Sequence, residues 1–305
     1  MDKCAWAAVI DGVELTKTPI ELMNEGGVAP GVELIVGTNR DEGSTFVLNQ
    51  SGTGDHRHTA DSSYHHFASP AGVVNDGDFA AFCKRVWGTD AMIPFYNYTM
   101  FPRTPDVPGH HGGPSVASDP WWRISRIVGD FVLTCPTRRA ARSLSKQGHS
   151  VYVYYFNHTP SYTVNVDEEA VQLEEGCFHG SDVPYFWLDD FELPAADELA
   201  LSAAIATRVT NFAWSGNPNV DAYTGKNGSE PWVQWPAYGA GAAGAASGGL
   251  TEGNIVFGPV QPQSGGAQNV SVMQGLHSEA CDWWDAWHEQ RGAAADAHAR
   301  HALGV

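Results

Sequence analysis

Apolar residues gather in three short runs, each about as long as one β-strand. The runs are Val32–Val36, Val151–Phe156 and Asn254–Phe257. The second run, Val-Tyr-Val-Tyr-Tyr-Phe, is β-branched or aromatic at nearly every position. That composition suits a strand buried on both faces of a mostly parallel sheet. The pattern therefore predicts three strands, with the middle one in the interior of the sheet.

Helical periodicity fills the longer segments between these runs. Residues 119–146 place apolar side chains on one face after an Asp-Pro start, and Pro136 breaks or restarts the helix there. Three further segments end at a glycine or carry apolar residues at helical spacing: Asp76–Trp87, Ala195–Trp214 and Ser278–Gln290. Strands that alternate with long helical segments predict the α/β class.

Composition limits the classes of partner. The chain has 305 residues and a net charge of −18, and such a charge would repel the phosphate backbone of a nucleic acid. No apolar run approaches the roughly 18 residues of a transmembrane helix. Residues 1–6 show no signal-peptide pattern. We therefore expect a globular protein with a small-molecule partner, no nucleic acid and no transmembrane segment.

Two short motifs carry candidate chemistry. Glu42 lies in Asn-Arg-Asp-Glu-Gly, directly after the first predicted strand, and His179 lies much later in Phe-His-Gly-Ser-Asp. An acid after a strand, followed by a histidine in a loop, is the order of α/β-hydrolases, in which a serine comes first on a Gly-x-Ser-x-Gly turn. No such turn occurs in these residues. The sequence thus indicates an ester hydrolase, and we expect this chain to be its C-terminal portion.

Several motifs in a fixed order carry a family resemblance. They are 9–12 (Val-Ile-Asp-Gly), 39–43, 128–130 with 135–136, 151–158, 178–185, 211–218, 235–238 and 281–285. In this order the chain resembles the C-terminal half of type-B carboxylesterases, the group of cholinesterases and some lipases. The resemblance implies the C-terminal portion of an α/β-hydrolase, with a mostly parallel sheet flanked by helices. We expect a partial domain over residues 1–291, without its N-terminal half, and a disordered tail over 292–305.

The resemblance also implies roles for single residues. Glu42 would be the catalytic acid and His179 the general base, with the carboxylate fixing the imidazole tautomer. Asp182 resembles the family's acidic residue beside the histidine and would support the site, although a surface acid fits equally well. Phe46 would line the substrate pocket, unless it is a core residue. Thr45 replaces the aromatic residue with which cholinesterases hold choline, which argues against a dedicated choline ester.

Cysteine and asparagine usage points to an oxidising compartment. By resemblance, Cys135 and Cys281 form a disulfide, and Cys177, close to His179, is interpreted as structural. Sequons occur at five positions, and Asn157 is expected to be too buried to be modified, which leaves Asn49, Asn97, Asn227 and Asn269 as glycosylation candidates. We expect a full-length form to be secreted or to enter the secretory pathway.

Histidine-rich motifs elsewhere do not change this interpretation. The histidines of residues 56–66 lack the spacing of a metal site, and the His-Gly-Gly at 111–113 lies on the wrong side of Glu42 for an oxyanion motif. We expect no metal and no cofactor. The function predicted is hydrolysis of carboxylic esters through an acyl-serine, with the chain inactive by itself. The alternatives are a non-catalytic, cholinesterase-like adhesion or binding module and a truncated product without function.

Overall fold

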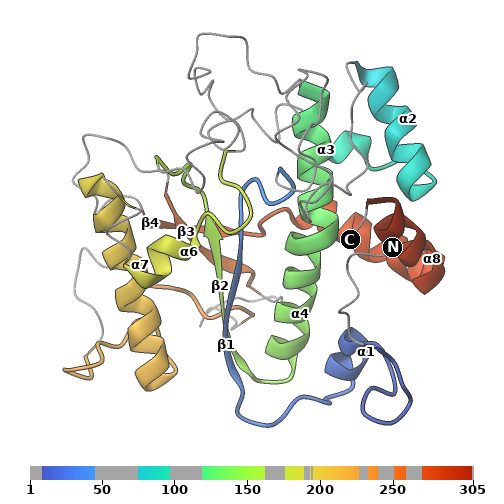
Figure 1. Ribbon diagram of the computed structural model, residues 1–305. Helices are drawn as coiled ribbons and strands as arrows, with labels where there is room; N and C mark the ends of the chain where they lie inside the picture. The colour runs from blue at the N-terminus through green and yellow to red at the C-terminus, as the bar shows by residue number, and fades with distance from the viewer. Residues whose placement is uncertain are drawn as a thin grey trace.

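The computed structural model describes residues 9–44, 75–96, 119–161, 176–188, 193, 195–226, 233–239, 251–258 and 270–303. These form a sheet with helices on both sides (Figure 1). The strands are β1 (Glu33–Asn39), β2 (Ser150–Phe156), β3 (Gly253–Phe257) and β4 (Val270–Gln274). The helices are α1 (Pro19–Asn24), α2 (Asp76–Trp87), η2 (Ile93–Tyr96), α3 (Asp119–Gly129), η3 (Asp130–Thr134), α4 (Cys135–Lys146), α6 (Val183–Trp187), α7 (Ala196–Ser215) and α8 (Ser278–Leu303).

The sheet has the order β1-β2-β3-β4 and is mixed rather than fully parallel. Strands β1 and β2 pair in parallel, as do β2 and β3, whereas β3 and β4 pair antiparallel. The sequence did not predict β4, because its Val-Ser-Val-Met-Gln segment is short and mostly exposed. The α/β class is correct, and the expectation of a mostly parallel sheet holds for the three predicted strands.

Strand β2 is buried on both faces, as its composition predicts. Tyr152 and Phe156 belong to the core on the side of α6 and α7, together with Tyr185 and Leu201. The alternate residues Val151 and Val153 pack with Ala141 and Leu144 of α4 on the other side. Successive side chains of a strand point to opposite faces, so a single strand supplies both layers of the core.

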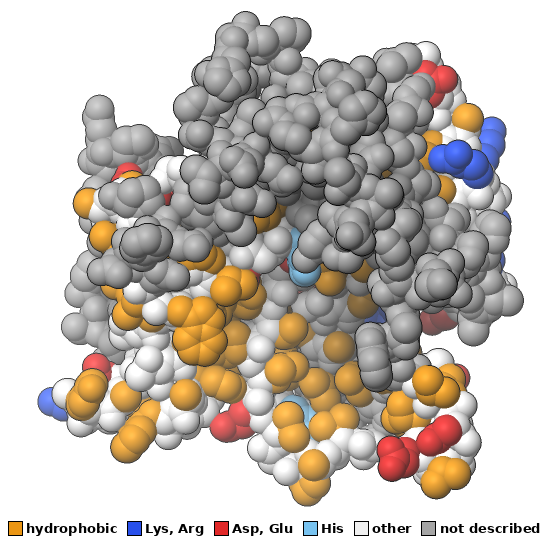
Figure 2. Space-filling view, in the orientation of Figure 1, with side chains coloured by type: hydrophobic (Ala, Val, Ile, Leu, Met, Phe, Trp, Pro, Cys, Tyr) orange, Lys and Arg blue, Asp and Glu red, His pale blue; other side chains and the backbone are white. Residues whose placement is uncertain are grey.

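Strand β1 lies at the edge of the sheet and is less covered. Its central residues Leu34, Ile35 and Val36 are only half-buried, although they are apolar. The space-filling view shows hydrophobic side chains gathered on this face of the molecule, below the grey atoms (Figure 2). The end of β1 is different, because Thr38 and Asn39 are buried. The turn that carries Glu42 follows that buried end.

A second core lies among the helices away from the sheet. Its centre is aromatic: the ring centroids of Phe131 and Trp284 lie 5.0 Å apart, and those of Trp87 and Trp284 lie 5.5 Å apart. The cluster joins α2, η2, α3, η3 and the first turns of α8. Aromatic rings of this size bury large apolar areas. The helical segment 119–146 contributes to both cores, because α3 and η3 belong to this aromatic cluster and α4 packs against the sheet.

Most predicted helices agree with the structure, and α8 is longer than expected. Helix α2 has the predicted bounds, Asp76–Trp87, and ends at a left-handed Gly88. Pro136 lies in the first turn of α4, so it restarts the helix after the π-helical segment η3. Helix α8 runs to Leu303 instead of Gln290, over residues expected to form a disordered tail. That stretch is rich in alanine, the strongest helix former. Within the described residues, no helix is both long and apolar enough to cross a membrane.

Candidate active site

Glu42 and His179 lie in contact, although 137 residues separate them in the sequence. Glu42 belongs to the turn that follows β1, and His179 belongs to the turn that precedes α6. The distance from His179 Nδ1 to Glu42 Oε2 is 2.6 Å. The expected meeting of the two side chains is therefore present. The exposed fraction is 46% for the His179 side chain and 7% for the Glu42 side chain.

The surroundings hold Glu42 by both oxygens. Its Oε1 accepts a hydrogen bond of 2.7 Å from the backbone N–H of Asn39, and its Oε2 faces His179. The hydrogen bond with Glu42, aided by the charges of Glu42 and Asp182, raises the pKa of His179 above its ordinary value despite the opposing effect of burial. A carboxylate held in this way favours the imidazolium form of its partner, which a general base needs after it has taken a proton.

Asp182 joins the turn of His179 to the sheet. Its Oδ2 accepts a hydrogen bond of 2.7 Å from Tyr154 on β2, and its Oδ1 accepts one of 3.1 Å from the Asn39 side chain. Burial and the neighbouring Asp182 raise the pKa of Tyr154, so the phenol remains a donor. A Cβ on Gly37 would lie 2.3 Å from the Tyr154 ring. Only glycine therefore lets this ring cross β1 toward Asp182.

Sequence analysis did not single out Asn39 as a site residue, yet it touches both turns. Its backbone N–H binds Glu42, and its side-chain amide donates to the carbonyl of Phe178 at 2.8 Å. The amide also reaches Asp182, as noted above. The signal available in the sequence was its place in the same five-residue motif as Glu42. One buried residue, Asn39, thus binds both Glu42 and the chain beside His179.

Asp41 forms a second link between the two turns. Its N–H donates to the carbonyl of Cys177, and the N–H of Cys177 donates back to Asp41 Oδ2, each at 2.9 Å. Its carboxylate also pairs with Arg40 at 2.9 Å and with Arg126 of α3 at 2.6 Å. Asp41 is fully buried. The sequence motif contains Asp41, but nothing in the pattern showed that a helix 85 residues later would supply an arginine.

The turn of Glu42 packs directly against α3 through two glycines. A Cβ on Gly43 would lie 1.9 Å from the carbonyl oxygen of Ser125, and one on Gly129 would lie 3.2 Å from the Cβ of Glu42. Both distances are shorter than ordinary contacts between a Cβ and its neighbours. Close approach of two backbones is a common reason for glycine. These two glycines therefore set how deeply Glu42 sits in the fold.

Cys177 is buried and serves the structure, in agreement with its interpretation from sequence. Its sulfur lies 3.0 Å from the carbonyl oxygen of Phe156. Burial raises the pKa of the thiol to about 12. A reactive thiol needs a lowered pKa, so nothing in this environment activates Cys177.

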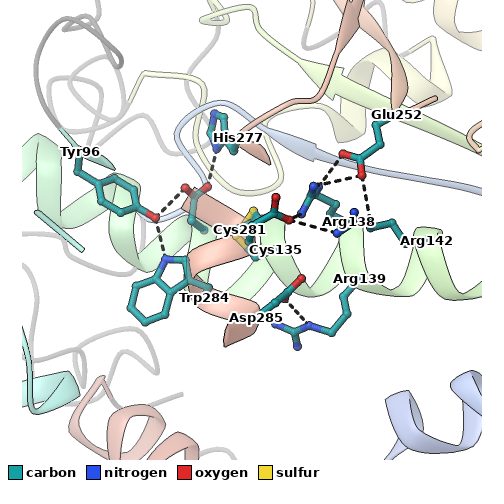
Figure 3. Close-up of a disulfide and its surroundings, with 12 residues drawn as sticks. Tyr96, Cys135, Arg138, Arg139, Arg142, Glu252, His277, Cys281, Trp284 and Asp285 are labelled. Atoms are coloured by element: carbon teal, nitrogen blue, oxygen red, sulfur yellow. Dashed lines mark hydrogen bonds and ion pairs between the residues drawn. A yellow bond between two sulfur atoms is a disulfide. The ribbon is translucent and has the colours of Figure 1, made fainter. Parts of the chain in front are cut away.

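The predicted disulfide between Cys135 and Cys281 is present, with Cα atoms 5.0 Å apart. It joins α4 to α8, and ion pairs flank it (Figure 3). On one side, Asp130 accepts from Tyr96 at 2.9 Å and contacts His277 at 2.6 Å. On the other side lie three arginines of α4 and their acidic partners, namely Arg138, Arg139 and Arg142 with Glu252, Asp282 and Asp285.

Several expectations concern residues outside the described ranges. These are Phe46 with Thr45, the histidines of residues 56–66 and 111, and the candidate glycosylation residues Asn49, Asn97, Asn227 and Asn269. Asn157 is described and half-buried, and its side-chain oxygen accepts a hydrogen bond of 2.9 Å from Arg40. Within the described ranges, no group of three or more His, Cys, Asp or Glu residues has a geometry for a metal ion.

Comparisons with known proteins agree with the family resemblance. The model of the carboxylesterase family matches residues 1–246. The chain is 25% identical over 236 residues to an acetylcholinesterase of Leptinotarsa decemlineata, covering 75% of this chain and 32% of the relative. It is 22% identical over 222 residues to the inactive carboxylesterase-like protein VdtD of Byssochlamys spectabilis, covering 70% of this chain and 34% of the relative. The chain thus spans about a third of the length of these relatives, and it belongs to the carboxylesterase family.

Proposed function

We propose that this chain supplies the acid and the base of a carboxylic ester hydrolase, Glu42 and His179. One observation carries the proposal: a buried carboxylate and a half-exposed imidazole lie 2.6 Å apart, on turns that follow a strand and precede a helix. Family membership supports ester hydrolysis as the reaction class. The buried residues Asn39 and Asp41 join the two turns by hydrogen bonds, which supports a site of fixed geometry.

The chemistry assigns one task to each side chain. Glu42 holds Nδ1 of His179, so that Nε2 is the ring nitrogen that exchanges a proton with the reacting groups. The imidazole takes the proton of a serine hydroxyl as that oxygen attacks the ester carbonyl, and then returns it to the departing alcohol. Glu42 stabilises the imidazolium between the two steps. Asp182 and Tyr154 keep the histidine turn attached to β2.

A serine on a Gly-x-Ser-x-Gly turn is the missing part of this mechanism, since residues 1–305 contain none. We propose that the nucleophile comes from further polypeptide, and that residues 1–305 alone show no turnover. Loss of one triad member removes most of the catalysis, because the three residues act as a unit. Phe46 as a pocket residue, and a substrate other than a choline ester, remain part of the proposal.

The experiment begins with the coding sequence upstream of Met1, which is searched for an in-frame turn of this kind. The polypeptide that contains it together with residues 1–305 is assayed with a short-chain chromogenic ester and labelled with a fluorophosphonate. We expect turnover and a labelled serine, and we expect His179→Gln to lower kcat by roughly 10⁶-fold. His277→Gln is the matched control, because His277 contacts a carboxylate at the same distance of 2.6 Å, and its kcat should change little.

Two results would contradict the proposal. One is equal loss of kcat in both histidine variants when both proteins remain folded. The other is fluorophosphonate labelling of a serine within residues 1–305 expressed alone. A soluble, cooperatively folding and inactive product of residues 1–305, with no upstream turn, would instead favour the non-catalytic binding module.

A secretory location is also part of the proposal. The disulfide between Cys135 and Cys281 supports it, because disulfides persist in oxidising compartments. Peptide mapping of secreted material tests it: the peptides of Cys135 and Cys281 should be linked, and Asn49, Asn97, Asn227 and Asn269 should carry glycans.

A further inference from the structure

Two adjacent carboxylates of the candidate site have entirely different partners. Glu42 faces His179 and the N–H of Asn39. Asp41 is paired with two arginines and accepts from the N–H of Cys177. Both side chains are buried, with exposed fractions of 0% for Asp41 and 7% for Glu42. Two neighbouring acids in one turn thus divide one histidine and two arginines between them.

Arg126 pairs with Asp41 and lies on the helix that packs against Glu42. It belongs to α3, three residues before Gly129, so the two share one face of that helix. The face carries Gly129 against Glu42, because a Cβ on Gly129 would lie 3.2 Å from the Cβ of Glu42. The guanidinium nevertheless pairs with Asp41, at 2.6 Å from Nη2 to Oδ1. With an exposed fraction of 7%, Arg126 is almost completely removed from water.

A buried arginine competes strongly for any carboxylate within reach. Arginine does not lose its proton in proteins, so removal from water is costly unless an acid compensates the charge. Histidine is a weaker competitor, because it can become neutral. If Asp41 carried no charge, the next carboxylate of the same turn, that of Glu42, would be the one left for Arg126 to pair with. An arginine bound to Glu42 would take the charge that His179 now uses.

We propose that Asp41 is a positioning residue that retains Arg126 and thereby reserves the Glu42 carboxylate for His179. This inference rests on the proposed acid and base roles of Glu42 and His179. It adds a division of charges to that function: the strong, permanent cations go to Asp41 and the titratable one goes to Glu42. Arg40 contributes to the same division, since its side chain pairs with Asp41 and with Asn157.

The test is a pH titration of His179 in the 305-residue chain, in which NMR of the ¹⁵N-labelled imidazole measures the midpoint. The signal is assigned by its loss in His179→Gln. In the wild-type protein we expect a midpoint above the ordinary value of about 6.5. In Asp41→Asn we expect the midpoint to fall toward that ordinary value, because Arg126 turns to Glu42. In Asp41→Asn combined with Arg126→Gln, the midpoint should return to the wild-type value. Asp182 and Tyr154, which also face this turn, are unchanged in all three proteins.

A matched control separates this effect from a general loss of charge. Arg123 lies on the same helix and pairs with Asp76 instead, so Asp41→Asn combined with Arg123→Gln should keep the lowered midpoint. A wild-type midpoint in folded Asp41→Asn, or a lowered midpoint in the variant with Arg126→Gln, would overturn the proposal. If Asp41→Asn alone does not fold, recovery of both folding and midpoint by Arg126→Gln supports the proposal, and failure of both variants to fold overturns it.

The proposed function has its own control in this titration. Glu42→Gln should lower the His179 midpoint whatever the role of Asp41. If the wild-type midpoint is not raised and Glu42→Gln does not change it, the pairing of acid and base fails, and the proposed function fails with it. If Glu42→Gln lowers the midpoint and Asp41→Asn does not, only the role of Asp41 is rejected.

Discussion

Two histidine–carboxylate pairs of equal length lie in different regions of this molecule. The pair of Glu42 and His179 lies at the end of β1, and the pair of Asp130 and His277 lies among the helices beside the disulfide, each at 2.6 Å. The exposed fraction of the histidine side chain is 46% for His179 and 11% for His277. The two pairs therefore have the same distance but differ in how far solvent reaches the histidine.

The second contacts of each pair explain the difference. Asp130 accepts from Tyr96, whose oxygen accepts in turn from Trp284 at 2.8 Å, so this pair is enclosed by donors in an aromatic core. His277 also has a left-handed backbone, with φ of 48°, which is uncommon for a residue other than glycine. We infer that the interior pair joins the residue before α8 to η3, whereas the pair at β1 is placed to exchange protons.

The largest expected effect on stability comes from the disulfide between Cys135 and Cys281, which lies beside the interior pair. Replacement of Cys135 and Cys281 by serine should lower the free energy of unfolding by about 2–5 kcal/mol. The titration midpoint of His179 should not change, because the disulfide lies in the other region. Urea denaturation and NMR of the same protein check both statements. A large shift of the His179 midpoint in a folded variant would show that the two regions are coupled.

A smaller effect should separate the two carboxylates. Asp130→Asn removes the charged acceptor of Tyr96 and His277 from the interior, and we expect a loss of about 1–3 kcal/mol in the free energy of unfolding. Glu42→Gln should cost less than about 1 kcal/mol, because solvent reaches its histidine. Urea curves of equal slope make the two losses comparable. A greater loss for Glu42→Gln would reverse the structural assignment of the two pairs.

The smallest effect is the pH dependence that the pair at β1 contributes. The pKa of His179 is raised in the folded protein, so its contribution to stability is complete below the ordinary pKa of about 6.5. That contribution is lost as the pH rises through the folded pKa. Because His179 is half-exposed, we expect a few tenths of a kcal/mol at most. The difference in unfolding free energy between wild type and Glu42→Gln, measured from pH 5 to pH 9, should shrink as the pH rises. A difference that grew with pH would contradict the direction of the shift.

The sequence predicted those parts of the fold that repeat a local pattern. Strand β2 and helix α2 were found because their side chains alternate or recur at helical spacing. Helices α1 and α6 were missed, since five or six residues are too few to show a helical period. Strand β4 was missed because it is short and mostly exposed. The end of α8 was misplaced, because the run of alanines after Gly292 carries no amphipathic pattern.

The site was predictable only as far as its motifs extend. The proposed acid and base, Glu42 and His179, were predicted from the order of motifs. The disulfide was predicted in the same way, and the structure confirms it. The contacts of Asn39 and Arg126 were not predicted, because they depend on how a turn meets a chain segment far away in the sequence. The need for glycine at position 37 was not predicted either, because it depends on the ring of Tyr154 on the neighbouring strand. Packing, and not local composition, decides these residues.

The disulfide separates Glu42 from His179 in covalent connectivity. His179 lies inside the loop closed between Cys135 and Cys281, whose sequence separation is 146, and Glu42 lies outside it. A single proteolytic cut inside the loop leaves both products joined through the disulfide, so His179 stays covalently attached to α4 and α8. A cut between Glu42 and Cys135 instead leaves Glu42 on a separate piece, held only by non-covalent contacts. Limited proteolysis followed by electrophoresis with and without reductant would therefore report on which side of Cys135 the chain was opened.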